Sequence, residues 1–127
     1  GALSALRELH LMHNHLTTLP QSIGNLTRLR KLFLRDNHLA VLPQAIGRLT
    51  HLTELDCRNN KLRQIPDSVG TMIALTDIDL RANRLTGLPD ALLALSHLQK
   101  LDLRWNAFID TPPIVGKLRE RGCSVFV

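Results

Sequence analysis

The amino-acid sequence predicts a single domain of the α/β class over residues 1–127, in which coils of chain stack side by side around one apolar core. Leucine fills 27 of the 127 positions whereas aromatic residues make up 3% of them, which indicates that one packing environment recurs. Asparagine recurs every 23 residues, at Asn14, Asn37, Asn60, Asn83 and Asn106. Proline recurs at the same interval, at Pro20, Pro43, Pro66, Pro89 and Pro112. A coil of this length cannot bury its leucines alone, so the coils must stack into a solenoid.

The repeats divide the chain into three parts. Five repeats of 23 residues cover residues 6–120 without insertion, and residues 1–5 match the end of a truncated repeat. Terminal repeats of a solenoid need a polar cap, and none precedes residue 6. We therefore expect a longer protein upstream or a partner over the first coil; a solvated first coil is the alternative. Residues 112–127 are predicted to form a C-terminal cap of a helix and a strand.

Each repeat opens with a predicted strand. In the second repeat Leu32 and Leu34 alternate with Lys31, Phe33 and Arg35. This period of two places the leucines on a buried face and the other side chains on an exposed one. The equivalent positions in all repeats therefore predict one strand per repeat, each with one buried and one exposed face.

The rest of each repeat returns the chain to the start of the next strand. Leu39, Leu42, Ile46 and Leu49 follow at irregular spacing, as expected of a chain that turns while its apolar side chains still point inward. Proline after Leu42 and glycine at Gly47 limit this segment to a loop or a short helical turn. The recurring asparagine can donate to and accept from backbone groups of neighbouring coils, which predicts a buried ladder of amides.

The C-terminal cap is predicted in detail. Pro112 and Pro113 can begin a helix that continues over 114–121 and ends at Gly122. Residues 123–127 alternate like a closing strand. Strict repeat spacing would direct Ser124 and Phe126 inward, but we favour the other register. The inward residues are then Cys123, Val125 and Val127.

The pattern LxxLxLxxNxLxxLPxxIGxLxx, found five times, resembles the leucine-rich repeat family in its 23-residue form. It is similar to intracellular Ras-binding scaffold proteins and to many bacterial repeat proteins. The resemblance implies a right-handed solenoid with a parallel β-sheet on its concave face and short helical or 3-10 segments on its convex face. It also implies that partners bind the concave face. The fold alone does not specify a function.

Four rows of side chains should lie across this concave face, one member from each repeat, about 4.8 Å apart. The rows are Glu8, Lys31, Glu54, Asp77 and Lys100; His10, Phe33, Asp56, Asp79 and Asp102; Met12, Arg35, Arg58, Arg81 and Arg104; and His13, Asp36, Asn59, Ala82 and Trp105. They sum to −1, although the chain carries +5. The positive surplus lies elsewhere, partly on an edge with His15, His38, Lys61, Arg84 and Arg63. The concave face is therefore a poor phosphate groove, and we expect no nucleic-acid partner.

The charged rows have two interpretations. Aspartate beside arginine could form a binding stripe that presents guanidinium groups to a partner. It could also form a self-neutralising ladder, in which each aspartate pairs diagonally with arginine, and we favour the ladder. The apolar exceptions on this face are Met12 and Phe33 near its N-terminal end and Trp105 near its C-terminal end. They bear more on binding, because Met and aromatic side chains are frequent hot spots. For Met12 and Phe33 the alternative is packing against an upstream coil or against their own neighbours. For Trp105 we favour a structural role, covering the terminal coil together with Phe108.

Other classes of function find little support in the sequence. His10, His13 and His15 lack the carboxylate or thiolate that would complete a metal site, and we expect no metal or cofactor. No nucleophile elbow or phosphate loop is present, which argues against an enzyme. No apolar run is long enough to cross a membrane. Cys57 and Cys123 should lie roughly 14 Å apart, too far for a disulfide, which favours an intracellular, cytoplasmic protein.

The sequence thus predicts a non-catalytic interaction module, monomeric or part of a longer chain, that binds a protein or peptide on its concave face. The alternative is a regulatory or substrate-recruiting part of a larger enzyme such as a kinase, GTPase or ubiquitin ligase. The predicted contact residues are Met12, Phe33, Arg35, Asp56, Arg58, Asp79, Arg81, Asp102, Arg104 and Trp105.

Overall fold

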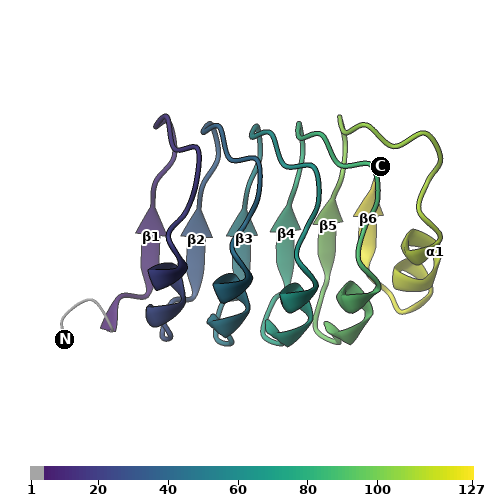
Figure 1. The fold of residues 1–127 in the computed structure, drawn as a ribbon. Coiled ribbons are helices and arrows are strands. Elements are labelled where there is room, and N and C mark those ends of the chain that lie inside the picture. Colours follow the sequence, from purple (N-terminus) through teal and green to yellow (C-terminus); the bar gives the residue numbers. More distant parts are fainter. Residues whose placement is uncertain (1–4) are drawn as a thin grey trace.

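The computed structural model describes residues 5–127 and shows a curved stack of coils (Figure 1). One face is a six-stranded parallel sheet with strands in sequence order: β1 (Glu8–His10), β2 (Lys31–Phe33), β3 (Glu54–Asp56), β4 (Asp77–Asp79), β5 (Lys100–Asp102) and β6 (Ser124–Phe126). The opposite face carries 3-10 helices and one α-helix: η2 (Gln21–Asn25), η3 (Gln44–Arg48), η4 (Asp67–Thr71), η5 (Asp90–Ala94) and α1 (Pro113–Glu120). The predicted fold class is confirmed. The partial repeat expected at residues 1–5 lies outside the described residues except for Ala5.

The strands pair with the predicted register. Leu32 lies beside Leu55, and Lys31 lies beside Glu54, one repeat apart. Leu32 and Leu34 are fully buried, whereas the neighbouring Phe33 is only half-buried. The alternation of apolar and polar residues therefore separates a leucine core from an open face, as predicted.

The asparagine ladder is confirmed. In its central step, the Nδ2 amide of Asn60 donates to the carbonyl oxygens of Leu34 and Cys57, at 3.0 Å each. Its Oδ1 accepts from the backbone N–H of Leu39 at 3.0 Å. Asn37, Asn83 and Asn106 repeat this arrangement. One side chain therefore satisfies backbone groups of two coils where the chain bends away from the sheet.

The convex helices begin after the recurring prolines and pack closely against one another. A Cβ atom at Gly47 would lie 2.7 Å from the carbonyl oxygen of Ser68 in the next helix. Gly24 meets the carbonyl oxygen of Ala45 at the same distance. The glycine of the LPxxIG segment is thus needed for helix-to-helix approach rather than for a turn. In η5 the equivalent residue is Leu93, and its neighbour is α1 instead of another 3-10 helix.

A backbone feature that the sequence did not indicate follows each of the first five strands. The fourth-row residue has a positive φ between 53° and 63° in every repeat: His13, Asp36, Asn59, Ala82 and Trp105. Alanine and tryptophan are not residue types that favour this left-handed conformation. In the first four repeats, the N–H of this residue donates to a carbonyl of the following coil, as from Ala82 to Arg104 at 2.9 Å. The inter-coil hydrogen bond offsets the backbone strain.

The C-terminal cap forms as predicted, with one correction. Helix α1 spans Pro113–Glu120, and Gly122 follows with φ +91°. Cys123 and Val125 are buried in the favoured register, but Val127 is 50% exposed, so its inward placement was wrong. The strand ends at Phe126, and Val127 lies beyond the last residue that pairs with β5.

A side chain of α1 forms hydrogen bonds with the outer edge of β6. Arg119 donates from Nη2 and Nε to the carbonyl oxygen of Val125, at 2.7 and 3.2 Å. The α-helix therefore satisfies a backbone acceptor that would otherwise point away from β5.

Both cysteines are buried and free. Burial raises the pKa of the Cys57 thiol far above its ordinary value, and burial also raises that of Cys123. Among residues 5–127, no helix has the length and apolar character needed to cross a membrane.

Candidate interaction surface

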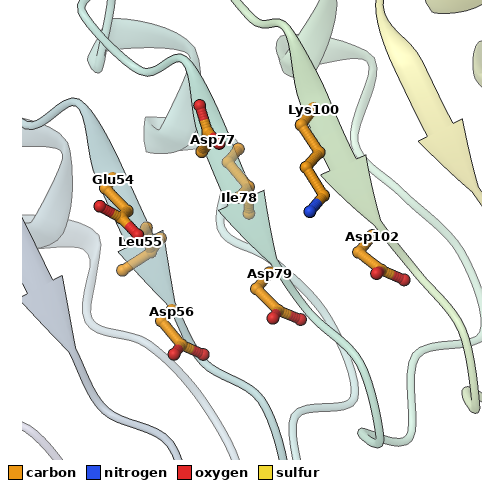
Figure 2. A pocket seen from close by; sticks show the side chains of 8 residues that line it. All are labelled: Glu54, Leu55, Asp56, Asp77, Ile78, Asp79, Lys100 and Asp102. Carbon is orange, nitrogen blue, oxygen red and sulfur yellow. The ribbon is translucent and has the colours of Figure 1, made fainter.

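The concave face brings the predicted rows together. Strand pairing places His10, Phe33, Asp56, Asp79 and Asp102 side by side across the sheet. Figure 2 shows the carboxylates of Asp56, Asp79 and Asp102 along one line, with Glu54, Asp77 and Lys100 along a parallel line. The side chains on which the binding prediction depends therefore share one surface, because parallel register repeats the same position in each coil.

A shallow depression of about 90 Å³ lies in the middle of this face. Leu55 and Ile78 form its apolar floor. Its polar lining consists of Glu54, Asp56, Asp77, Asp79, Lys100 and Asp102. Glu54, Asp77 and Lys100 were not among the predicted contact residues, although their place in the first row was the signal that could have identified them.

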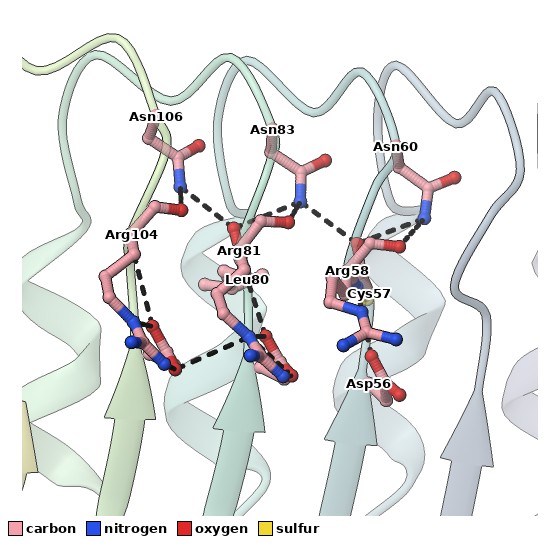
Figure 3. Close-up of polar contacts among 11 residues, drawn as sticks. Asp56, Cys57, Arg58, Asn60, Leu80, Arg81, Asn83, Arg104 and Asn106 are labelled. Carbon is pink, nitrogen blue, oxygen red and sulfur yellow. Dashed lines mark hydrogen bonds and ion pairs between the residues drawn. The ribbon is translucent and has the colours of Figure 1, made fainter. Parts of the chain in front are cut away.

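Two arginines pair with aspartates at the C-terminal end of the face (Figure 3). Arg81 contacts Asp79 through Nη2 and Oδ2 at 2.6 Å, and its Nε lies 3.4 Å from Oδ2 of Asp102 on the next strand. Arg104 contacts Asp102 at 2.7 Å. The self-neutralising ladder is therefore present over β4 and β5, with both in-line and cross-strand contacts.

Asp102 departs from the prediction of an exposed row. It is only 1% exposed, because β6 adds Phe126 directly beside it and two guanidinium groups cover its oxygens. Burial alone would raise the pKa of this carboxyl, but hydrogen bonds from Arg104 and the charges of Arg104 and Arg81 outweigh burial and hold the pKa below its ordinary value. Asp102 is a structural anion, in contrast to the exposed side chain that its row predicted.

Asp56 occupies the same row but has a different environment. Its Oδ1 accepts the backbone N–H of Arg58 at 3.0 Å, and no ion pair to it forms within residues 5–127. Burial raises the pKa of the Asp56 carboxyl and the negative Asp79 adds to this effect, although the Arg58 amide and the charges of Arg35 and Arg58 oppose it. Asp56 is therefore a half-buried anion near the charges of Arg35 and Arg58, but it forms no ion pair with either.

Arg35 and Arg58 complete the central part of the third row. Neither forms an ion pair with a carboxylate within residues 5–127, in contrast to Arg81 and Arg104. Nε of Arg35 is buried and has no hydrogen-bond partner. The ladder is thus interrupted over β2 and β3, and this part of the face retains unpaired charge of both signs.

The N-terminal end of the face is aromatic. The rings of His10 and Phe33 stack with centroids 4.6 Å apart, and His10 also contacts Glu8 at 3.1 Å. Met12 is half-buried in the adjacent row. These contacts order the aromatic pair while leaving it accessible.

The prediction that Trp105 covers the terminal coil was wrong. It is 68% exposed and has a positive φ, whereas Phe108 packs against the core. The guanidinium of Arg104 lies 5.6 Å from the Trp105 ring and 5.4 Å from the Phe126 ring. The exposed indole thus lies beside a cation that is already paired with Asp102.

The three N-terminal histidines point to different partners. His10 contacts Glu8, His13 contacts Asp36 at 2.9 Å, and His15 stacks on His38. Within the described part of the chain, no group of three or more His, Cys, Asp or Glu side chains is arranged to hold a metal ion.

Comparison with known proteins identifies similar chains. A family model described as a leucine-rich repeat region matches residues 1–84, more than half of the sequence. A leucine-rich repeat protein of Leptospira interrogans is 28% identical with a TM-score of 0.77, over 98% of this chain and 38% of that chain. An internalin of Listeria monocytogenes is 21% identical with a TM-score of 0.79, over 97% and 35%, and shows the fold alone. The sequence thus spans little more than a third of these two structures, and no protein of curated function matches it.

Proposed function

The chain belongs to the leucine-rich repeat family, and on that premise we propose that it is a non-catalytic module that binds a protein or peptide segment on its concave face. The observation that carries the proposal is the half-buried Asp56, which forms no ion pair within residues 5–127 and lines the central depression. A lysine or arginine of the partner would supply the missing charge. Binding would thereby offset the cost of holding this carboxylate partly out of water.

The surface around Asp56 supports the same interpretation. The stacked His10 and Phe33 offer an apolar platform beside it, and the guanidinium groups of Arg35 and Arg58 form no ion pair within residues 5–127. A solenoid presents these groups on strands rather than on mobile loops, so little conformational entropy is lost when a partner docks. We therefore propose a partner segment that combines a basic residue with an apolar one.

Two buried, free thiols support a place for the protein in a reducing, intracellular compartment. Small extracellular domains typically join their cysteines in disulfides, whereas Cys57 and Cys123 are both unpaired.

Site-specific photocrosslinking in a lysate of the source cell tests the concave-face proposal. A photoreactive phenylalanine analogue replaces Phe33, and in a second protein it replaces Ile73, which is 57% exposed in the turn after η4. We expect a discrete adduct from position 33 and none from position 73. The adduct should weaken strongly when Asp56→Asn is added, because the partner's cation loses its counter-charge.

The matched control is Asp67→Asn, which removes an exposed carboxylate from η4 on the convex face. An adduct that forms equally at positions 33 and 73, or one that Asp56→Asn and Asp67→Asn reduce alike, would contradict concave-face binding.

A further inference from the structure

A second surface lies on the loops that follow the strand ends, along the upper edge of the molecule in Figure 1. A hollow of about 500 Å³ crosses three successive coils there. We call it the basic edge groove, and it is lined by Ala40, Val41, Lys61, Arg63, Gln64 and Arg84. Stacking brings these residues together because each coil contributes its own loop to the same edge.

The charges of this groove are uncompensated. Lys61, Arg63 and Arg84 are exposed, and within residues 5–127 none of them forms an ion pair. No carboxylate lines the groove. The contrast with Arg81 and Arg104, whose guanidinium groups are paired on the concave face, shows that positive charge is concentrated here where no internal anion neutralises it.

The floor of the groove departs from the repeat pattern. Val41 is 49% exposed, and the equivalent positions in the other repeats are Thr18, Gln64, Gly87 and Asp110. The positions equivalent to Ala40 are Thr17, Arg63, Thr86 and Ile109. Two adjacent apolar residues therefore occur here only in the repeat that faces the cations, and solvation of a charged edge does not require them.

We propose that the basic edge groove binds an acidic peptide segment of a partner protein, with an apolar residue of that segment on Ala40 and Val41. Charge complementarity selects the carboxylates, and the apolar floor selects a side chain between them. No aromatic ring lines the groove to stack with bases, which favours a peptide over a nucleic acid. This surface is distinct from the concave face and does not depend on the function proposed above.

Fluorescence anisotropy of a short labelled peptide that alternates glutamate with leucine tests the proposal. We expect the double variant Lys61→Glu/Arg63→Glu to weaken binding by about tenfold or more, because it places like charges opposite the peptide. Val41→Ser, which adds no charge, should also weaken binding, through loss of the apolar floor. Arg28→Glu, which reverses an exposed cation outside the groove, should change affinity by less than about twofold.

Four parallel probes determine the chemistry: the same peptide with glutamine in place of glutamate, the peptide with serine in place of leucine, a duplex DNA fragment, and vesicles containing phosphatidylserine. The proposal requires the acidic, leucine-containing peptide to bind most tightly. It is overturned if that peptide does not bind, if the glutamine or serine peptide binds equally well, if DNA or vesicles bind more tightly, or if Arg28→Glu weakens binding as much as the double variant.

Two controls accompany the measurement. Circular dichroism melting of each variant verifies that the solenoid remains folded. Photocrosslinking from position 33 should be unchanged in Lys61→Glu/Arg63→Glu, so that failure of the groove proposal and failure of the concave-face proposal give different results.

Discussion

Asp56 and Asp102 lie in the same row of one sheet, and their carboxyl groups have opposite pKa shifts. Burial acts on both and by itself raises the pKa. At Asp102 the hydrogen bonds from Arg104 and the charges of Arg104 and Arg81 outweigh burial, so the pKa is lowered. At the half-buried Asp56, burial and the neighbouring Asp79 outweigh the Arg58 amide and the charges of Arg35 and Arg58, so the pKa is raised. The ionised Asp102 therefore stabilises the fold, whereas the ionised Asp56 at the equivalent position destabilises it.

The raised pKa of Asp56 predicts that removal of its charge stabilises the fold. A carboxyl whose pKa is raised on folding binds its proton more tightly in the folded state, so its contribution to stability falls as pH rises from the ordinary value of 3.8 through the folded pKa. Asp56→Asn keeps an acceptor for the Arg58 amide and removes the charge. We expect a higher melting temperature than wild type at pH 7, and a difference that shrinks below pH 3.8 in a series of thermal melts.

For Asp102 the sign is reversed. A carboxyl whose pKa is lowered on folding contributes stability above the ordinary value of 3.8, and this stability is lost as pH falls through the folded pKa. Asp102→Asn should therefore lower the melting temperature at pH 7 by several degrees, with a smaller loss in acid. The same shift of melting temperature at pH 7 and at low pH would contradict the ion-pair explanation.

At the scale of the secondary-structure element, the asparagine ladder links coils through the backbone. Asn60→Ala leaves the carbonyls of Leu34 and Cys57 and the amide of Leu39 without the side chain that pairs with them, so it should lower the free energy of unfolding by about 1–3 kcal/mol in urea denaturation. Asn14 is the control, because it is exposed and, within residues 5–127, its amide donates only to carbonyls of its own coil. Equal losses for Asn60→Ala and Asn14→Ala would show that the ladder contributes little.

The convex helices offer a matched pair of glycines. Gly47→Ala forces a Cβ atom against Ser68 and Thr71 of η4, and overpacking of this kind should cost about 1–3 kcal/mol. Gly116 lies within α1, where an added Cβ would have no neighbouring atom within 4 Å, so Gly116→Ala should instead stabilise by roughly 0.5–1 kcal/mol through helix propensity. Urea unfolding of both variants tests whether helix spacing, rather than backbone freedom, requires the first glycine.

The elements show which features a single sequence can predict. Strand positions, the asparagine ladder and the cap were predictable because a repeated leucine or asparagine has one role in every coil. Asp102 was misplaced because its burial depends on Phe126, which enters the row through a register shifted by one residue at the last strand. The left-handed residues were also missed, because Ala82 and Trp105 are held there by inter-coil geometry that residue preference does not indicate.

At the scale of the whole molecule, each coil contacts only its neighbours. A terminal coil therefore needs a capping element to cover its apolar side. Helix α1 packs on η5, and β6 pairs with β5. Deletion of residues 112–127 should therefore expose the leucines of the last coil, including Leu101 and Leu103, and cause aggregation that size-exclusion chromatography detects. A soluble, folded monomer after the deletion would contradict the role of the cap.

The rates at which the two buried thiols are alkylated would show which part of the stack unfolds locally first. Cys57 follows the third strand and Cys123 lies beside the last strand, and neither sulfur can react with an alkylating reagent until its surroundings open. Because opening of a solenoid can begin at one end and spread, Cys123 should be alkylated before Cys57 under native conditions. The ratio of the two labelling rates would then report how strongly the last coil is coupled to the middle of the molecule.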